Sequence, residues 1–242
     1  MSERFRSHGG SDGPDDDDFE LEEGAAEEPV YEDFPANLAA LPRVLSVFPL
    51  PGTVLFPYAS LPLHIVEERY KSMIADALEQ DRALAMMLGD DEDRELGARE
   101  FGAVAVITRV ESLEDGEKNI VVTGAYRCRI VEVLERRPYL VARIVPLEER
   151  GGELPLAPAF QALRSLAIQW VFFQDQDNAQ DLIRRISLVS KPGHLADFVA
   201  FNLFEEASLK QEVLETVDVG RRLARVHGLV QTALDRLQNE QK

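Results

Sequence analysis

The sequence has little cysteine and histidine, and this scarcity limits the chemistry that it can support. Cys128 is the only cysteine among 242 residues, so an internal disulfide and a cysteine-based zinc site are both excluded. We expect Cys128 to be a small core residue. The four histidines have no spacing that would place two of them on one face, so we expect packed or surface side chains rather than ligands or bases. They are His8, His64, His194 and His227.

Long apolar runs and catalytic motifs are also missing. No stretch approaches the roughly 18 apolar residues of a membrane-spanning helix, and Met1 to Gly10 lacks the apolar core of a secretory leader. We therefore expect a cytoplasmic protein that does not enter a membrane. The motifs Gly-x-x-x-x-Gly-Lys-Ser/Thr, Gly-x-Ser-x-Gly and His-Glu-x-x-His are absent. Gly89 to Gly97 resembles a calcium loop only loosely, so we expect a solvated loop, no metal and no cofactor.

Positive charge is scarce, since 26 Lys and Arg face 44 Asp and Glu and the formal net charge is -18. Residues 1–40 hold 13 of the acidic residues against only Arg4 and Arg6. A segment with so much charge and so few apolar residues cannot offset the entropy of ordering. We therefore expect a disordered acidic tail, which either solvates the chain or docks onto a basic partner. The acidity argues against nucleic-acid binding, because the chain repels phosphates.

From Arg43 to about Glu149 the sequence has mainly the pattern of strands. In residues 102–113 the alternation of a strand puts Val104, Val106 and Thr108 on one face, and Asp115-Gly116 then predicts a tight hairpin turn. With the short runs at 43–50 and 83–88, this indicates about five to seven strands, enough for a small barrel. The remaining strands are expected at 120–124, 126–134 and 139–147.

One helix is expected within this region, over residues 67–81. Its apolar residues recur at spacings of three and four, which lays a single stripe onto the sheet. They are Tyr70, Met73, Ile74, Ala77 and Leu78.

After residues 151–157, whose glycines and prolines predict a linker, the pattern changes to helices. The last of them carries an apolar stripe that suits either a coiled-coil seam or a helix that covers its own domain. The stripe consists of Val219, Leu223, Val226, Val230, Ala233 and Leu237. We therefore expect four parts, which are the acidic tail at 1–40, a β-barrel subdomain at 41–150, the linker, and a helical subdomain at 158–242.

The segment Phe48–Ile65, FPLPGTVLFPYASLPLHI, is apolar but carries four prolines. We expect these prolines at strand ends and bends, since proline cannot donate to a sheet ladder. Its apolar side chains serve either the core or a contact with another molecule. For the core we select Val54, Leu55 and Ile65, and for contact Phe56, Tyr58 and Leu63.

The order of these pieces, over residues 43–240, resembles the N-terminal substrate-binding domain of the Lon ATP-dependent proteases. The resemblance rests on several short motifs and on the helical stretches SLVSKPGHLADFVAFNL and KQEVLETVDVGRRLARV. The motifs are Phe48-Pro49-Leu50, Phe56-Pro57, Leu61-Pro62-Leu63, Glu67-x-Arg69-Tyr70, Gly124-x-x-Arg127-x-Arg129-Ile130 and Glu148-Glu149. It implies an α+β fold, with a PUA-like β pseudo-barrel that contains one helix, followed by an all-α helical bundle.

A Lon protease continues into an AAA+ ATPase and a serine-lysine peptidase, which this sequence does not contain. The resemblance therefore implies a non-catalytic module that binds unfolded or client polypeptides, with Phe56, Tyr58 and Leu63 as candidate contacts. An alternative is an adaptor that delivers clients to a separate ATP-dependent protease through its acidic tail. A nucleic-acid reader and an unrecognised enzyme are weaker alternatives. The sequence leaves the oligomeric state open between a monomer and a weak dimer.

Overall fold

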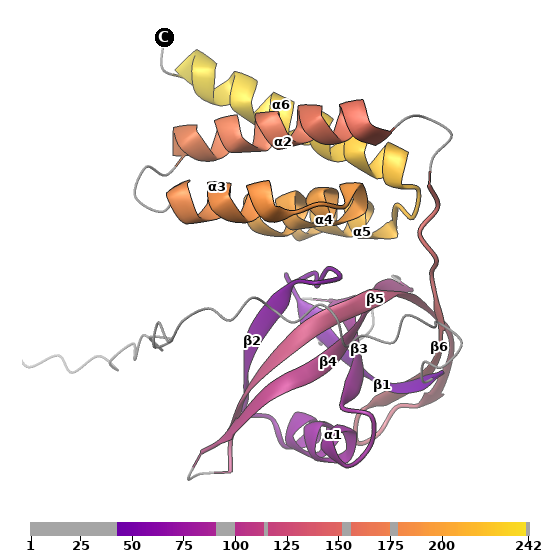
Figure 1. Ribbon diagram of the computed structural model, residues 1–242. Coiled ribbons are helices and arrows are strands. Elements are labelled where there is room, and N and C mark those ends of the chain that lie inside the picture. The colour runs from indigo at the N-terminus through magenta and orange to yellow at the C-terminus, as the bar shows by residue number, and fades with distance from the viewer. Residues whose placement is uncertain (1–42, 91–99, 114–115, 152–155, 175–178, 241–242) are drawn as a thin grey trace, which may run out of the picture. The chain divides into compact units, whose positions relative to one another are not determined.

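The computed structural model describes residues 43–90, 100–113, 116–151, 156–174 and 179–240, which Figure 1 draws in colour. The described elements all fall within one compact unit, Phe34–Lys242. The expected acidic tail and most of the expected loop at Gly89–Gly97 lie outside the described residues. The division into subdomains at 41–150 and 158–242 stays a prediction.

The described chain begins with strands and one helix and continues with helices, which confirms the predicted α+β class. The strands are β1 (Val44–Pro51), β2 (Ser60–Ile65), β3 (Ala83–Gly89), β4 (Phe101–Ser112), β5 (Lys118–Glu135) and β6 (Leu140–Pro146). Helix α1 (Glu68–Glu79) lies between β2 and β3 in the sequence. The later helices are α2 (Leu156–Gln174), α3 (Ala179–Leu188), α4 (Pro192–Leu203), α5 (Ala207–Glu215) and α6 (Val219–Glu240). We refer to β1–β6 with α1 as the sheet part and to α2–α6 as the helical part.

The strands form one mixed sheet in the order β2-β5-β4-β3-β1-β6, with a further pairing between β5 and β6. That pairing closes β5, β4, β3, β1 and β6 into a ring, which is the expected pseudo-barrel (Figure 1). Strand β1 lies parallel to β3 and antiparallel to β6. Strand β2 pairs with β5 alone among the described strands, so it forms an edge outside the ring.

Strand β5 corrects the expectation of separate strands at 120–124 and 126–134. It is one continuous strand of 18 residues. Its register with β4 shifts between Val104 and Ala105, whose partners are Tyr126 and Gly124. A β-bulge of this kind takes up an extra residue and bends the strand without ending it. One long strand can therefore pair with β2 in its first half and with β6 in its second.

The prolines of the apolar segment also depart in part from expectation. Pro51 ends β1 and Pro57 lies in a turn, as expected, but Pro49 and Pro62 lie inside β1 and β2. Strand β1 pairs with β6 through Val44–Val47 and with β3 from Val47 onward, so Pro49 lies where the strand has one neighbour. Pro62 lies in the edge strand. Both positions tolerate the missing N–H, because one side of the strand needs no ladder bond.

Helix α1 packs its predicted stripe against the sheet. Tyr70, Met73, Ile74 and Ala77 are buried in a cluster with Phe48 and other side chains from β1 to β5. A second cluster, from β1, β3, β4, β5 and β6, takes the alternate side chains of the strands that it shares with the first. Val54, Leu55 and Ile65, the three residues assigned to the core, are 2–3% exposed, which confirms that expectation.

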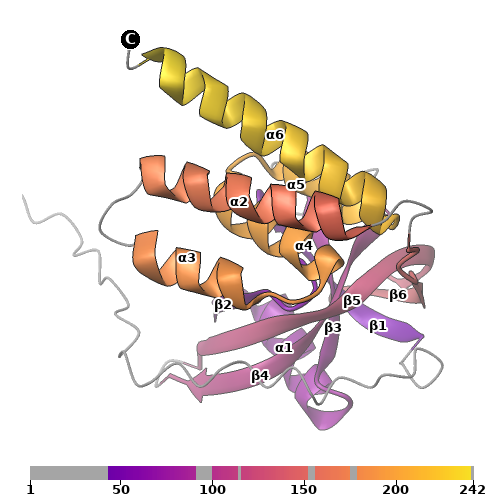
Figure 2. The same ribbon diagram turned by 45° about the horizontal axis from the view of Figure 1, so that its top comes forward.

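The helical part has its own core, and α6 packs against α2 and α4 within it (Figure 2). Val219, Leu223, Val226 and Val230 are buried as predicted, but the next buried residue is Leu234 rather than Ala233 or Leu237. The buried stripe thus follows the 3.6-residue period of a straight helix rather than the 3.5-residue period of a supercoil. This confirms the interpretation in which α6 covers its own chain.

No helix among the described residues combines the length and the apolar character needed to cross a membrane.

Candidate functional site

The turn between β1 and β2 brings the apolar segment against strand β5 at Gly124. The amide of Tyr58 donates to the carbonyl of Gly124 at 2.7 Å, and the amide of Gly124 donates to the carbonyl of Ala59 at 2.9 Å. A Cβ atom on residue 124 would lie 2.0 Å from the carbonyl oxygen of Phe56. Only glycine allows this approach. This is a physical reason for the Gly124 motif and the Phe56-Pro57 motif to occur in the same chain.

Phe56, the first candidate contact residue, is fully buried, with 0% of its surface exposed. It joins the core of the helical part, and its ring meets that of Phe201 of α4 edge-on, with centroids 6.4 Å apart. In this conformation Phe56 links the sheet part to the helical part and offers no surface to another molecule. Its role in client binding stays a prediction.

Tyr58, the second candidate, belongs to the turn between β1 and β2, and its partly exposed side chain lies against the start of α4. Its ring centroid is 3.7 Å from that of His194, and its φ of 66° is unusual for a bulky residue. Burial, and then the negative charges of Glu149 and Asp197, raise the pKa of the Tyr58 hydroxyl, so it stays neutral at physiological pH. Tyr58 is therefore an uncharged side chain against α4.

Leu63, the third candidate, lies on the edge strand β2 and is also partly exposed. It packs against the core beneath α1 rather than against the helical part. The structure thus brings Phe56 and Tyr58 to α4 and leaves Leu63 apart from them. No single site unites the three residues.

Charged side chains meet where the sheet part contacts the helical part. Arg127 of β5 is 2% exposed and donates two hydrogen bonds to Asp197 of α4, at 2.9 and 2.5 Å. It also donates to the carbonyl of Leu214 at 2.9 Å and to the carboxylate of Glu149 at 3.1 Å. One guanidinium therefore ties β5 to α4, α5 and the segment after β6.

Arg222 of α6 completes this group and is fully buried. Its Nε lies 3.1 Å from Asp197 Oδ1, its Nη1 donates to the carbonyl of Thr216 at 2.7 Å, and its Nη2 donates to Glu149. We call Arg127, Glu149, Asp197 and Arg222 the junction cluster. Three of its members are buried, and the fourth, Glu149, is 40% exposed, so the two cations face one buried and one partly solvated carboxylate.

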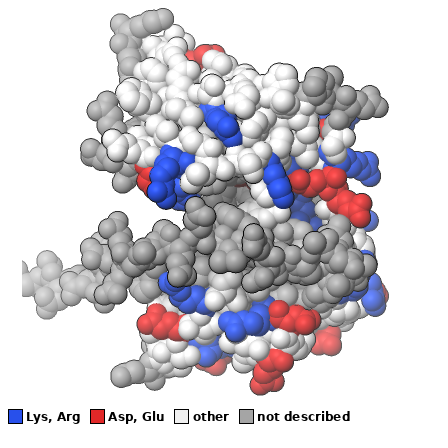
Figure 3. Space-filling model, viewed as in Figure 1, with Lys and Arg blue, Asp and Glu red and all other residues white. Residues whose placement is uncertain are grey.

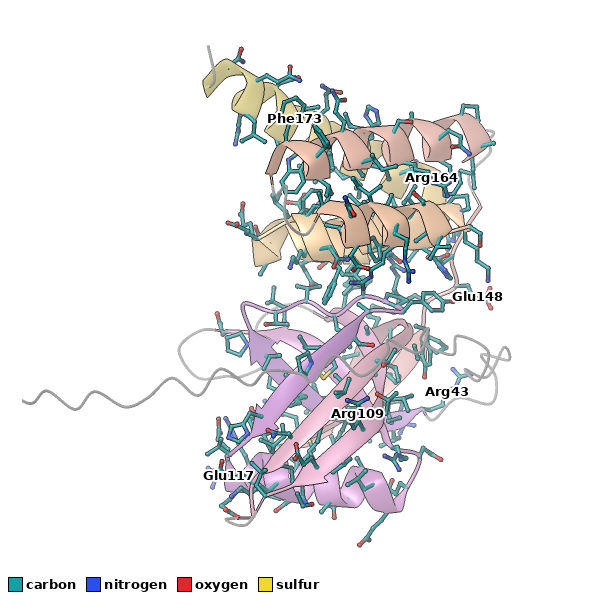
Figure 4. The ribbon with its side chains drawn as sticks, turned by 60° about the vertical axis from the view of Figure 1, so that its left-hand side comes forward. Arg43, Arg109, Glu117, Glu148, Arg164 and Phe173 are labelled. Atoms are coloured by element: carbon teal, nitrogen blue, oxygen red, sulfur yellow. The ribbon has the colours of Figure 1, made fainter. Side chains whose placement is uncertain are left out.

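The amino-terminal end of α4 lies directly against the junction cluster. A Cβ atom on Gly193 would lie 2.7 Å from Arg222 Nη2 and 2.8 Å from Glu149 Oε2, so a larger residue would disturb both side chains. The Glu149 segment is held there by backbone bonds, because Arg150 donates to the carbonyl of Val217 at 3.1 Å. In Figure 4 the neighbouring Glu148 lies between the strands and the helices.

His194 follows Gly193 and is neutral at physiological pH. Burial lowers its pKa to about 4, and the positive charge of Lys191 adds to this effect. The ring lies against that of Tyr58 at an interplanar angle of 47°. This agrees with the expectation of a packed histidine.

Other chemistry is limited in the described part of the chain. Among the described residues, no group of three or more His, Cys, Asp or Glu side chains is placed to hold a metal ion. Cys128 is 0% exposed, and burial raises the pKa of its thiol to about 12. It is a core residue, as expected.

The sequence interpretation did not find the junction cluster. Asp197 carries a detectable signal, because it is the only charge in the apolar helix Pro192–Leu203 and such a charge needs a buried partner. Arg127 and Arg222 carry no such signal, since they stand in segments with several other arginines. Two of the motifs on which the resemblance rests meet in this cluster, since Arg127 donates to Glu149.

Comparison with known proteins agrees with this fold. Residues 44–232 match the family model of the ATP-dependent protease La (LON) substrate-binding domain. The chain is 30% identical over 197 residues to a Lon protease of Dictyoglomus thermophilum and 31% identical over 193 residues to Lon protease 2 of Myxococcus xanthus. Each alignment covers 77% of this chain but only 24% and 23% of those relatives, so the chain spans about a quarter of their length.

Solved structures show the same fold. The N-terminal domain of Mycobacterium avium complex Lon protease superposes with a TM-score of 0.65 at 20% identity, covering 78% of this chain and 98% of that one. The Lon N-terminal domain protein from Xanthomonas campestris gives a TM-score of 0.58 at 21% identity, covering 76% and 96%. With the family match over most of its length, this chain belongs to the Lon substrate-binding domain family.

Proposed function

We propose that the chain is a non-catalytic protein-binding module that binds unfolded or client polypeptides. The match of residues 44–232 to a substrate-binding domain carries this proposal. Exposed apolar side chains on the described surface support it, among them Phe172 and Phe173, which are 63% and 41% exposed. An apolar side chain contributes roughly 1.5–3 kcal/mol when it leaves water, so several together reach the ~8 kcal/mol of a micromolar complex.

The candidate contacts remain Phe56, Tyr58 and Leu63, but they call for different experiments. Replacing Phe56 by alanine would disturb the core, because the side chain is fully buried. Leu63 is partly exposed, so Leu63→Ser tests a contact with less effect on stability. Tyr58→Phe keeps the ring against His194 and removes only the hydroxyl.

The test of the proposed function is binding of an unfolded protein to the full chain. We expect reduced, carboxymethylated α-lactalbumin to bind with a dissociation constant in about the micromolar range, and the native calcium-bound form to bind at least about tenfold more weakly. Fluorescence anisotropy of the labelled client measures both. Equal affinity for the two forms, or no binding of either, contradicts the proposal. The same preparation is expected to leave casein intact with and without ATP.

A second candidate function is an adaptor for a separate ATP-dependent protease, with the acidic residues 1–40 as the docking element. The excess of 13 acidic residues over two arginines in this segment favours it. Removing residues 1–40 should then abolish co-purification with the protease while client binding persists. If the shortened chain keeps both the protease and the client, only the first proposed function stands. The cytoplasmic location stays a prediction.

A further inference from the structure

Helix α2 has an outer face without charge. Its exposed residues recur at spacings of three and four from Ala157 to Phe173, so they share one side of the helix. The single charged residue of α2, Arg164, is partly buried and donates to the carbonyl of Val189. In Figure 3 the surface over the helices is largely uncharged, with Lys and Arg at separate places. We call the exposed residues, with the partly exposed Ile168, the α2 face. The exposed residues are Ala157, Pro158, Gln161, Ala162, Ser165, Gln169, Phe172 and Phe173.

Two large aromatic side chains stand at the end of the α2 face. Phe172 is 63% exposed and Phe173 is 41% exposed, and Figure 4 shows Phe173 toward the end of α2. Helix α1, by comparison, exposes Glu68 and Glu79, as is usual for a helix whose outer side meets water. An aromatic pair on an uncharged helix face is typical of a contact with another molecule.

Small and large side chains are divided about Ser165 in the α2 face. The half that precedes Ser165 is small at three of its four positions, and the half that follows is large at the positions equally far from Ser165. Each large apolar side chain therefore has a small counterpart at the same number of residues on the other side. The counterparts are Ile168 and Ala162, Phe172 and Pro158, and Phe173 and Ala157, while Gln169 corresponds to Gln161.

Two α2 helices that pack antiparallel about a two-fold axis at Ser165 bring these counterparts together. In such a contact each residue meets the residue of the other copy that lies equally far from the axis on the opposite side. The phenylalanines of each copy then cover the small residues of the other, and the glutamine amides can hydrogen-bond across the pair. A parallel pair would place large on large and small on small, which leaves space unfilled. The face is thus complementary in shape to an antiparallel copy of itself.

Charge permits a second copy but limits its affinity. An interface that faces itself must avoid charge near its axis, and the exposed residues of the α2 face carry none. Acidic residues adjoin both ends of the face in the sequence, Glu153 before it and Asp175 and Asp177 after it, and the chain has a net charge of -18. These charges repel between copies, and salt screens the repulsion. A face about 25 Å long and one helix wide also buries less than the roughly 1,200–2,000 Å² of a stable interface.

We infer that the α2 face is the interface of a weak homodimer, in which the α2 helices of two copies pack antiparallel about Ser165. This inference goes beyond the proposed function and does not depend on it. Its dissociation constant is expected at about 10–100 µM, so the monomer prevails at the lower concentrations at which client binding is measured.

Sedimentation equilibrium of the full chain tests the dimer. We expect the dissociation constant given above at about 300 mM NaCl, and a value about threefold or more higher at about 50 mM NaCl. Phe172→Ser with Phe173→Ser should raise it about tenfold or more, whereas Val66→Ser, on another surface and 49% exposed, should stay within about twofold. Circular dichroism melts verify that every variant is folded. A wild-type chain that is monomeric at about 500 µM, or a double serine variant that dimerises equally well, overturns the inference.

Disulfide trapping tests the antiparallel arrangement. Ser165→Cys places the thiols of both copies at the axis, so mild oxidation should link them, and the buried Cys128 adds no background. Gln161→Cys, on the same exposed face, is the matched control. In the antiparallel pair its two thiols lie about 12 Å apart along the helix, so it should link at least about tenfold more slowly. Adding Gln169→Cys to it should restore linking. Rapid linking by Gln161→Cys alone would indicate a parallel pair and overturn the inference.

Carboxymethylated α-lactalbumin separates this inference from the proposed function. A chain that dimerises through the α2 face but binds no client supports the inference and removes the proposed function. A chain that stays monomeric, and whose double serine variant loses client binding, assigns the face to the client. That result overturns the inference while the proposed function stands.

Discussion

Arg127 of β5 and Asp197 of α4, which are 70 residues apart in the sequence, form a bidentate ion pair in which each side chain is 2% exposed. The two hydrogen bonds, at 2.9 and 2.5 Å, join the sheet part to the helical part. Each of these two side chains needs the other, because either one alone would be an unpaired charge that is removed from water.

We predict that Asp197→Asn lowers the free energy of unfolding by about 3–5 kcal/mol, since it leaves Arg127 and Arg222 with less opposite charge. Urea denaturation followed by circular dichroism measures this loss. The control is Glu132→Gln, which breaks an ion pair to Arg143 whose side chains are 57% and 49% exposed. There the loss should be at most about 1 kcal/mol. Comparable losses in the two variants would contradict the buried role of Asp197.

Two glycines should respond to alanine in opposite directions. At Gly124 the added Cβ meets the Phe56 carbonyl oxygen at 2.0 Å, so Gly124→Ala should cost about 2–3 kcal/mol or more. At Gly228, inside α6, nothing lies within 4 Å of the added atom, so Gly228→Ala should stabilise the fold by about 0.5–1 kcal/mol. Thermal and urea unfolding of the two variants check the signs. A tolerated Gly124→Ala would show that the turn at Phe56 can move away.

His194 should make the folded state sensitive to acid. Its pKa is about 4 in the folded protein against the ordinary histidine value of 6.5, so the unfolded chain binds more protons between these values. The contribution of the neutral ring is therefore complete above about pH 6.5 and is lost as the pH falls toward 4. Urea titrations at pH 7.5 and pH 4.5 measure the total loss. In His194→Gln the loss should be smaller, and an unchanged loss would assign it to other groups.

Cys128 should be inert in the folded protein. Its side chain is 0% exposed and burial raises the pKa of the thiol to about 12, so little thiolate exists at pH 8 and none of it is reachable. A thiol reagent such as dithionitrobenzoate should react only as fast as the chain unfolds, and fully in urea. Rapid reaction without denaturant would show that β5 opens locally.

Much of the fold could be predicted because local patterns and the tertiary structure agree. The stripe of α1 points inward the side chains that the structure buries. In β4 the expected face is only partly buried, because Val104 is buried but Thr108 is exposed. Strand β5 was divided wrongly because Gly124 is typical of a strand end when read locally. Glycine is required at position 124 by a residue far away in the sequence, because the carbonyl of Phe56 lies against it.

The site was less predictable for the same reason. Phe56 and Leu63 have similar sequence surroundings, yet one is buried against Phe201 and the other lies on an edge strand. Arg127 and Asp197 are 70 residues apart, so tertiary structure and no local pattern brings them together. The sequence of α2 predicts an apolar helix with a single charge, Arg164, but it does not show which of the apolar side chains stay exposed.

The position of β1 between β3 and β6 has a consequence for synthesis on the ribosome. Its second neighbour, β6, begins at Leu140, roughly 90 residues after β1 ends at Pro51. At about 5–20 residues per second, one side of β1 waits on the order of 5–20 s for its partner strand. The ring therefore cannot close until nearly all of the sheet part has left the exit tunnel, and until then one side of the apolar strand β1 has no partner strand.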